Sequence, residues 1–168
     1  MDLQSASLPH RNFGYRPPRT LAEGIRQTTL RIVVRWRILV VTRILIVDDS
    51  AFVRQRLHDL LQQHPGWVVC GEAVDGLDAV EKTRELIPDL IVLDFQMPGM
   101  DGLRAAREIA KLVPTVPILM FSMHMSRQLV EEARNAGCRG AVAKSDVGHV
   151  IEGLEALLRH ESFFASSN

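Results

Sequence analysis

The chain has 168 residues, of which 46% are hydrophobic and 24% are charged, as is typical of one globular domain. Two cysteines, Cys70 and Cys138, exclude a disulfide framework and indicate free thiols in a reducing compartment. The formal net charge is zero, yet residues 1–43 hold eight arginines and two acids, whereas residues 44–168 hold 12 basic and 18 acidic side chains. This asymmetry indicates two segments with different roles or origins.

Residues 1–42 are predicted to be a basic, largely disordered extension. The apolar run over residues 30–47 is interrupted by four arginines, and each would cost about 2.5–3.5 kcal/mol at the centre of a bilayer. We therefore expect no membrane span, and because no apolar core with a cleavage site lies near the start, we expect a cytoplasmic protein. Residues 21–41 fit either a helix or an extended segment. The extension fits either a functional segment or a start assigned upstream of the true one.

From Arg43 onward, short apolar runs alternate with amphipathic stretches. The predicted strands are Ile44–Val47, Trp67–Ala73, Leu90–Leu93, Ile118–Phe121 and Gly140–Ala143. The predicted helices are Ala51–Gln63, Leu77–Leu86, Leu103–Leu112, Arg127–Ala136 and Val147–His160. Five strand–helix repeats with continuous apolar strands indicate the α/β class, with a buried parallel sheet, helices on both faces and right-handed connections.

Residues typical of helix ends lie where this pattern needs them. Asp101, Ser126 and either Ser145 or Asp146 are predicted N-caps, because their side chains can accept hydrogen bonds from the first free backbone N–H groups. Gly137 is predicted to end a helix in the left-handed conformation.

Polar side chains stand where four of the five predicted strands end. The first strand is followed by Asp48 and Asp49, the third by Asp94, the fourth by Ser122 and the fifth by Lys144. Parallel strands present their carboxyl ends at one edge of the sheet, so these groups should converge. Clustered carboxylates repel one another unless a cation neutralises them, and Mg²⁺ is the hard oxygen-seeking ion that suits them.

The same groups have the chemistry of phosphoryl transfer. The Lys144 ammonium can neutralise a phosphoryl oxygen, the Ser122 hydroxyl can donate to another, and an aspartate can be the nucleophile. Each residue alone has a plainer explanation: helix capping for Asp48 and Asp49, a solvated loop acid, a turn serine or a surface lysine. Their joint occurrence at the strand ends favours a site.

Several motifs give residues 43–160 a resemblance to a known family. The carrying segments are Ile44–Ser50, the loop Asp94–Gly102, Met120–Ser122 and Gly140–Lys144. Together they resemble the receiver domain of response regulators in two-component signalling. The resemblance implies a flavodoxin-like, doubly wound (βα)5 fold with a five-stranded parallel sheet in the order 2-1-3-4-5. Residues 161–168 would then be a C-terminal tail.

The resemblance also implies roles for individual residues. Asp94 would be the phosphoacceptor, and it would attack a phosphohistidine on a histidine kinase or phosphotransfer protein. Asp49 would ligate Mg²⁺ directly and Asp48 mainly through water, while Asp94 and the backbone carbonyl of Gln96 would be the other protein ligands.

Two further roles concern the phosphoryl group and its readout. Lys144 would pair with the phosphate, and Ser122 would bond the phosphoryl group and report its presence. The signal would pass to a downstream output protein or a homodimer through the fourth and fifth predicted helices and the strand between them. We expect a stand-alone receiver without a DNA-binding domain or membrane association, because few residues follow the fifth helix.

Three positions depart from the family pattern. Ala141 stands where receivers often have Tyr or Phe, so the usual aromatic switch is absent. Ser145 replaces a proline that often follows the lysine, and Met123 replaces a small residue. Our hypothesis is that Met123 and Gln96 flank the path of attacking water and alter the lifetime of an aspartyl phosphate.

Two other functions remain open on the sequence. One is a degenerate receiver that binds a partner without being phosphorylated, which the change at Ala141 would suit. The other is a small Mg²⁺-dependent phosphohydrolase with an aspartate nucleophile. The predicted strand–helix connections are short and would leave the site open to a protein donor, which favours the receiver.

Overall fold

The structure is a computed structural model that describes residues 41–164. The chain separates into two units, residues 1–39 and 40–168, and all described residues belong to the second. The predictions of a largely disordered extension over residues 1–42 and of a helix or extended segment over residues 21–41 lie outside the described residues, apart from residues 41 and 42.

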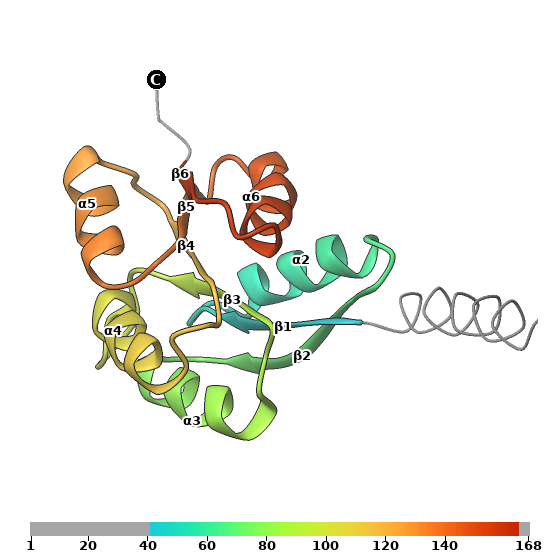
Figure 1. The fold of residues 1–168 in the computed structure, drawn as a ribbon, viewed down its shortest axis with the longest axis horizontal. Helices are drawn as coiled ribbons and strands as arrows, with labels where there is room; N and C mark the ends of the chain where they lie inside the picture. Colours follow the sequence, from blue (N-terminus) through green and yellow to red (C-terminus); the bar gives the residue numbers. More distant parts are fainter. Residues whose placement is uncertain (1–40, 165–168) are drawn as a thin grey trace, which may run out of the picture. The chain divides into compact units, whose positions relative to one another are not determined.

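All strands of the described chain belong to one parallel sheet (Figure 1). The strands are β1 Thr42–Val47, β2 Trp67–Ala73, β3 Leu90–Asp94, β4 Ile118–Ser122, β5 Gly140–Ala143 and β6 Phe163–Phe164. The helices are α2 Ala51–Gln62, α3 Gly76–Leu86, α4 Gly102–Leu112, α5 Arg127–Asn135 and α6 Gly148–Leu158. The strand order is β2-β1-β3-β4-β5-β6 with every neighbouring pair parallel. The predicted α/β fold with the order 2-1-3-4-5 is therefore confirmed, and a sixth strand extends it.

Helices cover both faces of the sheet, which explains why its central strands are continuously apolar. Figure 1 shows α2 and α6 on one face and α3, α4 and α5 on the other. Every residue of β3 and of β4 is buried. Successive side chains alternate between two cores: Ile44 and Ile46 join the core under α2 and α6, whereas Leu45 joins the other.

Most of the predicted helix ends are confirmed. Asp101 accepts a hydrogen bond from the backbone N–H of residue 104, and Ser126 accepts one from residue 129. Gly137 has a φ of 95°, as expected for a glycine that ends a helix. The predicted cap of α6 is wrong: Val147 occupies that position without a side-chain hydrogen bond. The carboxylate of Asp146 instead contacts the ring of His149.

The segment predicted to be a tail contains the short strand β6. His160 has a φ of 63°, which turns the chain back after α6. The backbone N–H of Phe163 then donates to the Arg139 carbonyl at 3.0 Å. Cα atoms of Phe163 and Phe164 pair with those of Gly140 and Ala141. A strand of two residues is too short to show an alternating pattern, which is why the sequence did not predict it.

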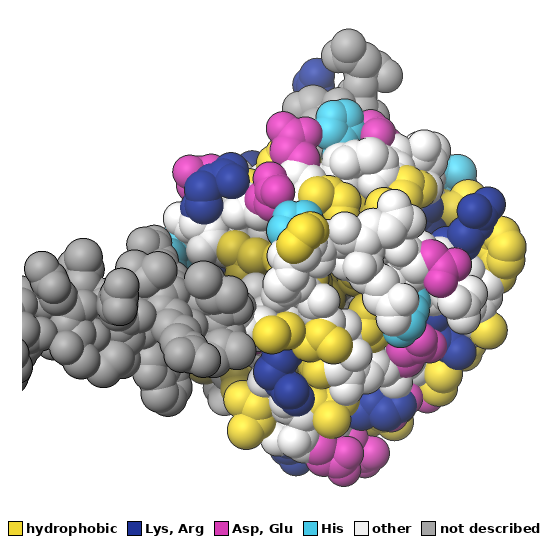
Figure 2. Space-filling view, turned by 90° about the vertical axis from the view of Figure 1, so that its right-hand side faces the viewer, with side chains coloured by type: hydrophobic (Ala, Val, Ile, Leu, Met, Phe, Trp, Pro, Cys, Tyr) yellow, Lys and Arg dark blue, Asp and Glu magenta, His cyan; other side chains and the backbone are white. Residues whose placement is uncertain are grey.

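The surface of the described chain mixes charge and apolar character. Figure 2 shows hydrophobic side chains lying between scattered groups of Lys, Arg, Asp and Glu on the face it presents. Phe52, Leu77, Ile87 and Met123 are the most exposed large hydrophobic side chains of the described residues. None of the helices within residues 41–164 combines the length and apolar character needed to cross a membrane.

Candidate functional site

The predicted site residues lie at the carboxyl ends of neighbouring strands. Asp48 and Asp49 directly follow β1, Asp94 is the last residue of β3, Ser122 is the last of β4, and Lys144 directly follows β5. Because β1, β3, β4 and β5 are consecutive in the parallel sheet, these side chains emerge at the same edge.

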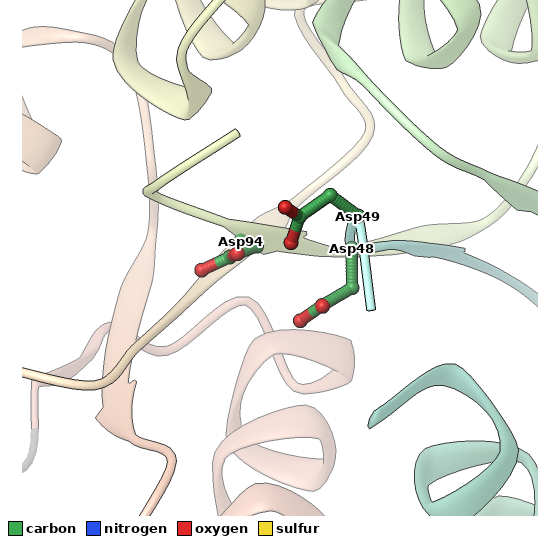
Figure 3. Close-up of side chains that lie close together, drawn as sticks. All are labelled: Asp48, Asp49 and Asp94. Atoms are coloured by element: carbon green, nitrogen blue, oxygen red, sulfur yellow. The ribbon is translucent and has the colours of Figure 1, made fainter. Parts of the chain in front are cut away.

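Three carboxylates form the centre of this edge. Figure 3 shows Asp48, Asp49 and Asp94 from the ends of β1 and β3 gathered around a shared space. One oxygen of each lies within 4.8 Å of the others. Asp48 and Asp94 are buried, whereas Asp49 is exposed. Such a cluster can offer the buried oxygens of Asp48 and Asp94 to a cation, while the cation stays accessible to solvent on the side of Asp49.

Lys144 bridges the two buried carboxylates. Its Nζ lies 2.6 Å from Asp48 Oδ2 and 2.9 Å from Asp94 Oδ2, and its side chain is 10% exposed. Burial raises the pKa of Asp94, and the nearby Asp48 adds to this, although Lys144 and the Gln96 backbone N–H act in the opposite direction. Desolvation alone would lower the pKa of Lys144, but its two carboxylate partners outweigh this effect and raise it.

The two carboxylate oxygens of Asp48 have different partners. Asp48 Oδ1 accepts from the Ser50 backbone N–H at 2.9 Å. Asp48 Oδ2 is buried, and its partner among the described residues is the Lys144 ammonium, whose Nζ lies 2.6 Å away. Among the described residues, the three carboxylates have one ion-pair partner, Lys144, so the cluster keeps an excess of negative charge. Carboxylate oxygens gathered in this way fit a divalent cation, so these residues suit Mg²⁺.

Ser122 and Gln96 border the cluster without belonging to it. The Ser122 hydroxyl donates to the His124 carbonyl at 3.3 Å, within the loop that follows β4. To donate to a phosphoryl oxygen on Asp94, it would have to leave that bond. Gln96 lies exposed in the loop after β3, where its backbone lowers the pKa of Asp94. The role of its carbonyl as a metal ligand stays a prediction.

Arg54, which the sequence did not single out, supports the loop after β1. Its guanidinium donates to the Asp48 carbonyl at 2.8 Å and to Glu72 Oε2 at 2.9 Å. It thereby ties the acidic pair to β2 and holds the backbone from which both carboxylates project. An arginine within a helix has no sequence signal for such a role, since Glu72 is distant in the chain.

Gly102 is a second residue whose importance only the structure shows. A Cβ at this position would lie 2.0 Å from the Asp94 carbonyl oxygen, although the residue has no unusual φ. The Gly102 N–H donates to the Phe95 carbonyl at 2.9 Å, which closes the loop between β3 and α4. The start of α4 therefore packs directly against the backbone that carries Asp94. The Asp-Gly pair at this helix start was visible in the sequence, but the contact was not.

A groove of about 560 Å³ adjoins the site on the α2 side of the sheet. Lys144 and Phe121 lie at its inner end, and the exposed apolar side chains Phe52, Met123 and Val147 line its rim. The rim residues come from α2, from the loop after β4 and from the cap of α6. The site thus opens onto a largely apolar surface that a protein could contact.

Comparison with known proteins decides the family. The family model described as the response regulator receiver domain matches residues 44–155, which is more than half of the chain. The chain belongs to this family.

Individual relatives agree with this assignment. The chemotaxis protein CheY of Thermotoga maritima is 41% identical over 113 residues, which cover 67% of this chain and 93% of that protein. The crystal structure of the response regulator domain of T. maritima CheB superposes with a TM-score of 0.61 at 37% identity, covering 71% of this chain and 92% of that domain.

Other relatives are much longer than the matched region. A protein-glutamate methylesterase/protein-glutamine glutaminase of a Nocardioides species is 40% identical over 116 residues, which are 67% of this chain but 32% of the relative. The receiver spans about a third of the length of that protein, so the activity in its name is not carried over to this chain.

Proposed function

We propose that this receiver accepts a phosphoryl group on Asp94 from a phosphohistidine of a histidine kinase or phosphotransfer protein. The observation that carries the proposal is the bridging of the two buried carboxylates, Asp48 and Asp94, by Lys144 at 2.6 and 2.9 Å. The ammonium sits where it can neutralise charge on a group attached to Asp94. Membership of the receiver family supports the same role.

The transfer step follows from the chemistry of the two partners. An Asp94 carboxylate oxygen attacks the phosphorus, a P–O bond forms, and the P–N bond to the donor imidazole breaks. The imidazole nitrogen keeps the bonding electron pair and takes up a proton. Lys144 neutralises charge on the phosphoryl oxygens, and Ser122 donates to one of them after leaving the His124 carbonyl.

We assign Mg²⁺ as the cation of the acidic cluster. Asp48, Asp49 and Asp94 would hold it together with the Gln96 carbonyl, and the nearness of one oxygen from each carboxylate supports this set. When bound, the ion supplies neutralisation of the negative charge that three carboxylates and a phosphoryl group bring together.

We further propose that the donor contacts the groove beside the site. Phe52 is 69% exposed and Met123 is 58% exposed, so an approaching protein can bury both while its phosphohistidine reaches Asp94. Phe52→Ser should slow labelling by a phosphorylated histidine phosphotransfer domain that labels the wild type. It should leave labelling by acetyl phosphate unchanged, because the small donor needs no groove.

Output would pass through the surface of α5, β5 and α6 to a separate protein or a second copy of the chain. Phosphorylation would shift a pre-existing equilibrium between two arrangements of this surface. In the structure β6 covers the outer edge of β5. A homodimer that uses this edge would therefore have to displace β6.

Incubation with acetyl phosphate and Mg²⁺, followed by intact-protein mass spectrometry, tests the proposal. The wild type should gain one phosphoryl group, and Asp94→Asn should gain none while keeping its fold. Asp101→Asn is the matched control, because asparagine also caps helices and Asp101 lies in the same loop. Labelling of the Asp94→Asn variant, or sustained turnover of sugar or nucleotide phosphates by the wild type, would contradict the proposal.

A further inference from the structure

The strand β6 occupies a closely fitted place at the edge of the sheet. A Cβ on Gly140 would lie 2.6 Å from the Phe163 carbonyl oxygen, and a Cβ on Gly153 of α6 would lie 3.0 Å from the Phe163 ring. Both distances are shorter than ordinary contacts, so β6 can approach β5 and α6 this closely because both positions are glycine. This close fit indicates that β6 is an integral part of the domain.

The two aromatic rings of β6 lie on opposite faces of the sheet. Phe163 packs with the core under α2 and α6, whereas Phe164 packs against the core that contains Ala141. Phe164 and Ala141 are register partners, so they share a face. The Arg134 guanidinium of α5 lies over the Phe164 ring, 3.6 Å from its centroid. Phe164 therefore fills the space beside the small Ala141 and connects β5 to α5.

A row of side chains relates Phe164 to the phosphoacceptor site. Met120 on β4 pairs with Ala141 on β5, which pairs with Phe164 on β6. Ser122 is two residues beyond Met120, so it lies on the same face, one step closer to the carboxyl ends of the strands.

Helix α5 provides the second connection. The Ser122 hydroxyl bonds to the His124 carbonyl, in the loop that leads directly into α5, and α5 carries Arg134. A movement of Ser122 toward a group on Asp94 would break that bond and pull on the loop. The stacking of Arg134 on Phe164 resists such a movement from the other end of the helix.

We propose that β6 is an autoinhibitory element coupled to the phosphoacceptor site. Phe164 holds α5 against β5 in the unphosphorylated arrangement, and occupation of Asp94 draws the loop and α5 away from the ring and releases β6. Release uncovers the edge of β5 between α5 and α6, which then becomes available to an output partner. This inference rests on the proposed function, since it takes Asp94 as the residue that is modified.

The coupling predicts a reciprocal effect that can be measured without a kinase. Beryllofluoride with Mg²⁺ imitates the phosphoryl group on an aspartate, and its affinity can be measured by calorimetry on the full chain. If beryllofluoride binding weakens the packing of Phe164 against β5, then packed Phe164 must weaken beryllofluoride binding by the same factor. A variant that loses this packing should therefore bind beryllofluoride more tightly. We expect Phe164→Leu and Arg134→Gln each to bind beryllofluoride at least about fivefold more tightly, and the double variant no more tightly than either.

Hydrogen exchange provides the structural readout. In the wild type, beryllofluoride should speed exchange of the Phe163 N–H, which bonds to the Arg139 carbonyl, while residues 94–102 become protected. Arg107→Gln is the matched control, because this arginine lies on α4, and it should match the wild type. Arg134→Gln changes an exposed side chain and should leave the fold intact, so the test does not depend on Phe164 variants folding.

The outcomes separate the two proposals. Binding that protects residues 94–102 but leaves β6 exchange and the affinities of all variants unchanged would overturn the coupling alone. Failure of beryllofluoride to bind the wild type would overturn both the proposed phosphoacceptor role and the coupling that rests on it.

Discussion

Replacing Gly102, the first residue of α4, by alanine should displace Asp94 at the end of β3. The new Cβ would lie 2.0 Å from the Asp94 carbonyl oxygen and 2.9 Å from its carbonyl carbon. Ordinary contacts begin at 3.4 Å, so the start of α4 and the end of β3 must separate by roughly 1 Å or more, as in an overpacked core. Because both elements are buried backbone, neither can yield as a flexible side chain would.

The expected magnitudes follow from that displacement. Overpacking of this kind costs about 1–3 kcal/mol of folding stability. A shift of about 1 Å at a reacting group can slow a positioned reaction by roughly 100-fold. We therefore expect Gly102→Ala to unfold at lower urea and to be labelled by acetyl phosphate at least about tenfold more slowly.

The matched control is Gly148→Ala at the start of α6. There a Cβ would meet only the Asp146 carboxylate, at 4.0 Å, and Gly148 has no positive φ. This variant should be as stable as the wild type or slightly more so, because alanine favours a helix. Equal urea-unfolding midpoints and equal rates of labelling by acetyl phosphate for Gly102→Ala and the wild type would refute the reasoning.

Three further predictions concern the buried ionisable groups. Lys144→Met leaves two buried carboxylates without their cation and should lose roughly 3–5 kcal/mol in urea unfolding, part of which millimolar Mg²⁺ restores by binding the folded state. The exposed Lys111, which pairs with Glu108, is its control, and Lys111→Met should change stability by less than about 0.5 kcal/mol; equal losses for both would contradict the burial argument. Because burial raises the folded pKa of Asp94, the unfolded chain gives up this proton first, so the wild type loses stability as the pH rises above 3.8 toward the folded pKa. Asp94→Asn should therefore be the more stable protein at neutral pH without Mg²⁺, with a difference that shrinks on acidification; a difference independent of pH would refute this. Burial raises the pKa of the Cys138 thiol to about 12, so iodoacetamide at about pH 8.5 should modify this thiol only after unfolding. Modification of native Cys138 as fast as in urea would show that the thiol is accessible.

The division of the domain into elements was accessible from sequence because it depends on local pattern. Runs such as Leu90–Leu93 are apolar throughout since they are buried on both faces. Caps such as Asp101 and Ser126 act within three residues of their own position. The cap of α6 was mispredicted because Asp146 has a second local partner, His149, and its carboxylate contacts that ring.

The convergence of Asp48, Asp94 and Lys144 also followed from the sequence, because parallel strands must end at the same edge of a sheet. The pattern did not show that Lys144 reaches both carboxylates, or that Asp48 and Asp94 are buried while Asp49 is exposed. Those features depend on rotamers and burial, which arise only once neighbouring strands pack.

Contacts between residues far apart in the chain were decided by the tertiary structure alone. The nearness of Gly102 to the Asp94 backbone reflects how α4 packs against β3. The pairing of Phe164 with Ala141 depends on where the chain turns after α6 and on a strand of only two residues. The spacing of apolar residues along the chain indicates which face of a helix or strand is buried. Contacts such as these depend instead on how the elements are placed relative to one another, and no local sequence pattern encodes that placement.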